Sequence, residues 1–189
     1  MKFTFVKSLP LLAALALCGC EATVSKKPVG ERGAELKPDD WNGRWVGGDG
    51  TILETKIKDA KLGLVELTPV KPKAKPGEPK EIDLVVRTLG THTIVNLKQK
   101  PTDEAYDFGR VSVDNTHLVG FAPNTPMFIE LIKEGKLTGR IEKDKDGKLT
   151  GSCTLESFTE QDYQRLKRDG VDVRALFGED PVTVAVRVK

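Results

Sequence analysis

The chain offers few side chains of the kinds that act as nucleophiles or bind metal, with three cysteines and two histidines in 189 residues. One arrangement to consider is a thiol nucleophile at Cys153 with His92 or His117 as its base. No motif for such a nucleophile surrounds Cys153, and free cysteine usually behaves as a small buried apolar residue. His-x-x-His and Cys-x-x-Cys spacings are missing as well, so the sequence predicts no enzyme, no metal site and no cofactor.

The other two cysteines, Cys18 and Cys20, stand at the end of an apolar run that covers residues 9–17. Lysines precede this run and small residues follow it, which is the layout of a secretory signal peptide. We therefore expect residues 1–19 to be a signal peptide that the mature protein lacks.

The order Leu17-Cys18-Gly19-Cys20 resembles the lipobox of bacterial lipoproteins. The resemblance implies that Cys20 becomes the first residue of the mature chain and carries diacylglycerol through a thioether. Two or three acyl chains anchor a protein stably to a membrane, whereas one chain does so only marginally. Because Glu21 and not Asp follows the cysteine, the resemblance also implies transfer to the periplasmic face of the outer membrane rather than retention at the inner membrane.

Processing changes both the charge and the cysteine count. Removal of residues 1–19 takes away two lysines and no acidic residue, so 28 basic side chains stand against 28 acidic ones. A neutral chain argues against a nucleic-acid partner, because such domains usually carry a basic excess on one face. Cys153 becomes the remaining free thiol, and an intramolecular disulfide is excluded.

Residues 21–40 mix charge, Pro and Gly and contain almost no aromatic or β-branched side chains. Such a composition cannot bury enough apolar surface to order itself. We therefore predict that residues 20–40 form a lipidated cysteine and a flexible tether, followed by a single β-rich domain over residues 41–189.

The domain is predicted to be α+β and mainly antiparallel. From residue 41, about six or seven short runs rich in Val, Ile, Thr and aromatic residues alternate with Gly, Pro and Asp turn signals. The connections are too short for parallel crossovers. The final run, residues 181–189, has the clearest two-residue alternation in the chain.

One or two short helices interrupt the strands. Pro126, an apolar face and Gly135 predict a helix over residues 125–134, with a strand as the alternative. A second helix is predicted after a cap at Ser157 or Thr159, before Gly170. Between the two, a repeated Gly-Lys-Leu-Thr-Gly predicts a hairpin that turns at residues 146–147.

Gly43-Arg44-Trp45, at the first predicted strand, resembles the Gly-x-Trp signature of lipocalin-like barrels. The resemblance implies a barrel or half-barrel in which the tryptophan plugs one end beneath an arginine from a late strand. Arg187 is then the implied partner of Trp45, and both become candidates for binding an apolar ligand. The alternative is that Trp45 is an ordinary core residue.

These observations predict a cell-envelope lipoprotein with a non-catalytic structural or interaction domain, whose partners are the membrane and an envelope protein. The alternatives are a carrier that holds an apolar molecule or lipid in a lipocalin-like cavity and, with less support, a cysteine-dependent enzyme.

Overall fold

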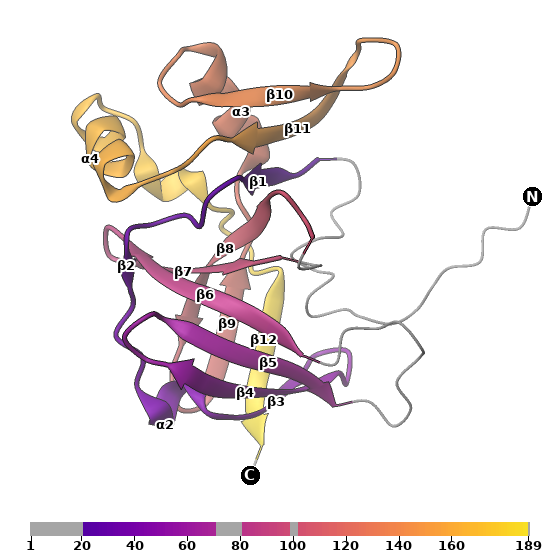
Figure 1. Cartoon of the computed structure of the whole chain (residues 1–189), viewed down its shortest axis with the longest axis vertical. Helices are drawn as coiled ribbons and strands as arrows, with labels where there is room; N and C mark the ends of the chain where they lie inside the picture. The colour runs from indigo at the N-terminus through magenta and orange to yellow at the C-terminus, as the bar shows by residue number, and fades with distance from the viewer. Residues whose placement is uncertain (1–20, 71–80, 99–101, 189) are drawn as a thin grey trace, which may run out of the picture.

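The computed structural model describes residues 21–70, 81–98 and 102–188 (Figure 1). The strands form one twelve-stranded sheet, and nearly all of the paired neighbours are antiparallel, as the sequence predicts. Eight strands follow one another around a closed barrel, because the last of them pairs with the first and the seventh. They are β3 (Gly43–Gly47), β4 (Ile52–Asp59), β5 (Leu64–Val70), β6 (Ile82–Leu89), β7 (His92–Leu97), β8 (Tyr106–Val113), β9 (His117–Phe121) and β12 (Thr183–Val188).

The barrel interior is filled mainly by aliphatic side chains that alternate with outward-facing residues along each strand. The buried members of this inner core are Ala34, Leu36, Trp41, Leu53, Val65, Leu67, Ile82, Leu84, Val86, Val95, Leu97 and Val111. On β12 the alternation places Thr183 and Ala185 inward and leaves Val184 and Val186 45% and 48% exposed. The predicted strand at the end of the chain is thus confirmed, with its valines on the outside.

A second layer packs against the outer wall of the barrel and is formed largely by residues 122–182, between β9 and β12 (Figure 1). It contains α3 (Thr125–Lys133), β10 (Gly139–Lys143), β11 (Leu149–Leu155), α4 (Glu160–Arg168) and the 3-10 turn η1 (Val173–Leu176). Its outer core includes Phe108, Phe128, Phe158, Phe177 and Tyr163. None of the helices in the described part of the chain has the length and apolarity needed to span a bilayer.

Both predicted helices and the predicted hairpin are confirmed. Asn124 caps α3 by accepting a hydrogen bond from the backbone of Met127. Thr159 caps α4 through a reciprocal capping box with Asp162. Strands β10 and β11 pair antiparallel, and Gly147 in their turn has a φ of 78°, a conformation that favours glycine.

The prediction of a flexible tether over residues 20–40 is wrong for the described part of that segment. Strand β1 (Thr23–Ser25) lies between β11 and β8, parallel to the first and antiparallel to the second. Val29 is fully buried, and buried Asn96 accepts a hydrogen bond from its N–H at 2.6 Å and donates one to its carbonyl at 3.2 Å.

The remainder of the segment is also ordered on the barrel. β2 (Arg32–Gly33) pairs with β6, and the short helix α2 (Pro38–Trp41) leads into β3. Strands β1 and β2 pair with strands more than 50 residues away in the sequence, and the composition of the segment does not carry that information.

Candidate functional site

The best-defined polar cluster lies at the end of the barrel where α2 enters β3. Trp45 is 1% exposed, and its indole N–H donates to the hydroxyl of Thr55 on β4 at 2.8 Å. That hydroxyl donates in turn to the carbonyl of Trp41. The cluster therefore fixes the entry of the chain into the barrel with a fully hydrogen-bonded indole.

Arg187, on the last strand, covers this tryptophan. Its guanidinium carbon lies 4.6 Å from the centroid of the Trp45 ring, within the range of a cation–π contact. A terminal nitrogen of the same side chain donates to the carbonyl of Asp40 at 2.7 Å. The contact between Arg187 and Trp45 that the resemblance implies is confirmed, and it joins the two ends of the barrel sequence.

The first residue of the Gly-x-Trp triplet has a steric role. A Cβ atom at Gly43 would lie 3.2 Å from the guanidinium carbon of Arg187, closer than nearly all real contacts of this kind. Glycine therefore leaves the space in which the guanidinium lies over the indole. The sequence predicted the Gly-x-Trp triplet and its partner Arg187. It predicted neither the steric role of Gly43 nor the hydrogen bonds made by Thr55 and the Asp40 carbonyl.

A different lining is found on the inner wall formed by β8, β9, β12 and β3. Their inward positions include four small residues, Gly109, Gly120, Ala185 and Gly47, which alternate along the strands with larger side chains such as Val111 and Trp45. Among the described residues, a Cβ atom at Gly120 would meet only Thr183 within 4 Å. This wall therefore contains more small side chains than the strands from β4 to β7, whose inward positions carry mainly leucine, isoleucine and valine.

The outer surface of β3, β4 and β5 carries an open groove of about 660 Å³. Its charged lining is Arg44, Glu54, Lys56 and Glu66. Arg44 is paired with Glu54, and Lys58 bridges Glu66 and Asp83 at 3.0 and 2.7 Å. Balanced charges of this kind favour neither an anionic nor a cationic ligand.

Cys153 is 1% exposed in the outer core. Its sulfur lies 3.5 Å from the hydroxyl of Thr23, and burial raises the pKa of the thiol above its ordinary value. A raised pKa lowers the thiolate fraction, which is opposite to what a nucleophile requires. The expected role of a small buried residue fits this environment.

The two histidines lie in different settings. The His92 ring makes edge contacts with Tyr163 and Phe177, and desolvation followed by the nearby Arg110 charge lowers its pKa. His117 is exposed at the start of β9 and is hydrogen-bonded to Asp114 and Thr116 in the turn before it. No cluster of three or more potential metal ligands occurs among the described residues.

Cys20 and residues 1–19, for which a signal peptide is predicted, lie outside the described residues, but the chain that follows Cys20 is hydrogen-bonded to β11. The N–H of Ala22 donates to the Ser152 hydroxyl at 3.0 Å, and its carbonyl accepts from the N–H of Cys153 at 2.8 Å. Next to it, Glu21 packs over Gly151, where an added Cβ would lie 2.8 Å from the Glu21 side chain. The domain therefore begins within two residues of Cys20.

The chain matches no family model, no curated protein and no solved structure.

Proposed function

We propose that this protein is a bacterial lipoprotein in which acylated Cys20 anchors a non-catalytic barrel domain to the periplasmic face of the outer membrane. The observation that carries the proposal is the lipobox-like order Leu17-Cys18-Gly19-Cys20 immediately before a chain that joins the domain at Ala22. A domain that starts so close to its anchor suits a fixed component of the cell envelope.

The closed barrel supports a structural or interaction role. Its interior is apolar, and the Trp45–Arg187 contact ties its first and last strands together. On the outside of β12, Val184, Val186 and Val188 are 45%, 48% and 36% exposed. Apolar residues gathered on a surface are typical of sites that bind other proteins.

Metabolic labelling with a fatty-acid analogue tests the anchor. The wild-type protein should take up the label, Cys20→Ala should not, and Cys18→Ala should be labelled like the wild type because that residue leaves with the signal peptide. Fractionation should place the wild-type protein with outer membranes. Label on Cys20→Ala, or its loss from Cys18→Ala alone, would contradict the assignment.

A second candidate function is a carrier for an apolar molecule in a lipocalin-like barrel. The observation that favours it is Gly120 on the inner face of β9, where an added Cβ would meet only Thr183 within 4 Å among the described residues. In this proposal an apolar ligand would lie against Gly120 and face the leucines and valines of the opposite strands.

Two glycine variants test the carrier. Gly120→Leu should displace a bound apolar fluorescent probe, because the new side chain would project into the barrel. Gly48→Leu is the matched control, since its Cβ meets no described atom within 4 Å and lies in the exposed β3–β4 turn. Equal probe binding by both variants and the wild type would exclude this use of the interior.

A further inference from the structure

The short connection between Cys20 and the domain limits how far the domain can lie from its anchor. Two peptide units join Cys20 to Ala22, and consecutive Cα atoms are 3.8 Å apart, so the two Cα atoms lie within about 8 Å of each other. Ala22 is held to β11 by hydrogen bonds of 3.0 and 2.8 Å through its N–H and carbonyl.

An acylated Cys20 would have its glycerol at the boundary between the acyl chains and the headgroups. The headgroup layer of one leaflet is about 5–8 Å thick. The start of β11 would consequently lie at the depth of the headgroups or directly on them.

The part of the domain next to this point is the tip of the β10–β11 hairpin, residues 143–150, all of which are exposed. In Figure 1 the tip projects from the second layer on the side where the chain enters β1. Glu21 packs over Gly151, and Leu149 is two residues further toward the tip on β11.

The tip has the composition of a headgroup-binding surface. Leu149 is 48% exposed, whereas Cys153 and Leu155, further along the same strand, are buried. Lys143, Lys145 and Lys148 are exposed around it. The two aspartates of the tip leave a small basic excess, and the carboxylate of Asp144 accepts hydrogen bonds from the backbone of the turn at 2.9 Å.

We propose that the β10–β11 tip docks on the headgroups of the membrane that holds Cys20, with Leu149 among the headgroups and the three lysines toward lipid phosphates. The proposal rests on the anchor assigned above. Docking of the tip holds the domain on the bilayer in one orientation, with the tip against lipid and the β4–β5 turn directed away from the membrane.

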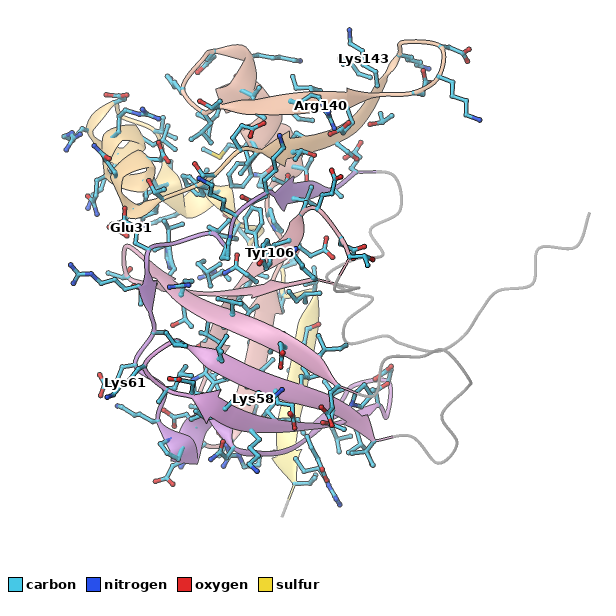
Figure 2. All side chains as sticks on the ribbon, viewed as in Figure 1. Glu31, Lys58, Lys61, Tyr106, Arg140 and Lys143 are labelled. Atoms are coloured by element: carbon cyan, nitrogen blue, oxygen red, sulfur yellow. The ribbon has the colours of Figure 1, made fainter. Side chains whose placement is uncertain are left out.

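The chain offers a matched pair of positions for a test. Leu62, in the β4–β5 turn, is 58% exposed, similar to Leu149. Figure 2 shows how far the two regions are separated: labelled Lys61, the neighbour of Leu62, lies at the lower left, and labelled Lys143 lies at the upper right.

The experiment uses the acylated mature protein in vesicles of phosphatidylethanolamine and phosphatidylglycerol that contain a spin-labelled headgroup lipid. Leu149→Cys or Leu62→Cys carries a fluorophore, and Cys153 stays in place because burial protects it. We expect quenching at position 149 to be several-fold stronger than at position 62. Inserting about ten Gly and Ser residues after Glu21, which span roughly 17 Å, should bring the two positions close to equality.

Each other outcome has a definite meaning. Equal quenching at both positions in a protein with confirmed acylation would overturn the docking orientation and leave the anchor intact. A difference that survives the insertion unchanged would show that the short connection does not impose the orientation. A mature protein without acyl chains on Cys20 would overturn both the anchor and the docking surface.

Discussion

The inner core of the barrel and the outer core on its wall are built from different side chains. The inner core consists of Val, Leu, Ile and Ala with Trp41 at one end. The outer core gathers four of the seven phenylalanines, and their rings meet edge to face. The phenylalanines are therefore concentrated where the layer of helices and the β10–β11 hairpin packs on the barrel.

The difference has a physical reason. Barrel strands are held on both sides by hydrogen-bonded neighbours, so branched aliphatic residues on a pleated surface suffice to fill the interior. The elements of the outer layer are short helices and a hairpin, which are marginal in isolation. Large aromatic rings supply more buried area per residue and compensate for the weaker backbone support.

The largest expected effect is that of Phe128→Ala in the outer core. The Phe128 ring lies 5.9 Å from Phe108 and 5.6 Å from Phe158, and the side chain is fully buried. Truncation should lower the free energy of unfolding by about 3–5 kcal/mol in chemical denaturation. Hydrogen exchange should increase first in α3, β10 and β11. Equal acceleration in the barrel strands would show that the two cores unfold as one unit.

Asn96→Ala should have a smaller effect on stability. It removes the side chain that binds the N-terminal segment to the barrel. The variant leaves the buried N–H of Val29 without its acceptor and the carbonyls of Val29 and Val85 without their donor. We expect a loss of about 1–3 kcal/mol in the free energy of unfolding. Limited proteolysis should cut the variant earlier within residues 23–30, and an unchanged cleavage pattern would contradict the role of Asn96.

Arg187→Lys tests the contact that joins the barrel ends. Lysine keeps the charge but loses the planar stacking on Trp45 and the directed hydrogen bond to Asp40. The expected loss is about 1–2 kcal/mol by denaturant titration. Arg44→Lys is the control, because its pair with Glu54 is exposed and contributes at most about 1 kcal/mol. Similar losses of unfolding free energy in the two variants would show that Arg187 contributes no more to stability than an exposed ion pair does.

The smallest expected effect concerns pH and His92, the first residue of β7, whose ring contacts Tyr163 and Phe177 of the outer core. Burial and Arg110 lower the pKa of His92 below its ordinary 6.5. The unfolded chain therefore binds a proton more readily than the folded one, and stability falls as the pH drops through 6.5 toward the lowered pKa. His92→Gln should show a smaller decrease in melting temperature between pH 7.5 and 5.5 than the wild type. Identical decreases in melting temperature in the two proteins would show that groups other than His92 cause the pH dependence of stability.

Much of the barrel and of the outer layer was predictable from local pattern. The strand at residues 183–188, the capped helix after Thr159 and the turn at Gly147 all follow from signals within a few residues. The helix that begins at Thr125 was predicted with a strand as its alternative, and the Asn124 cap decides for the helix.

The order of the N-terminal segment could not be predicted in this way. Thr23 pairs with Cys153, 130 residues later, and Val29 depends on Asn96. Composition averaged over residues 21–40 contains no information about these distant partners. For the Trp45 cluster, the sequence suggested Arg187 through a resemblance, whereas Thr55 and the Asp40 carbonyl carry no sequence signal of their own.

The most direct test of the account is the mass of the N-terminal peptide of the mature protein, isolated from the membrane fraction. We predict that this peptide begins at Cys20, carries acyl chains on that residue and continues with Glu21 and Ala22. A peptide that begins before Cys20, or an unmodified Cys20, would contradict the lipid anchor and the membrane orientation that depends on it.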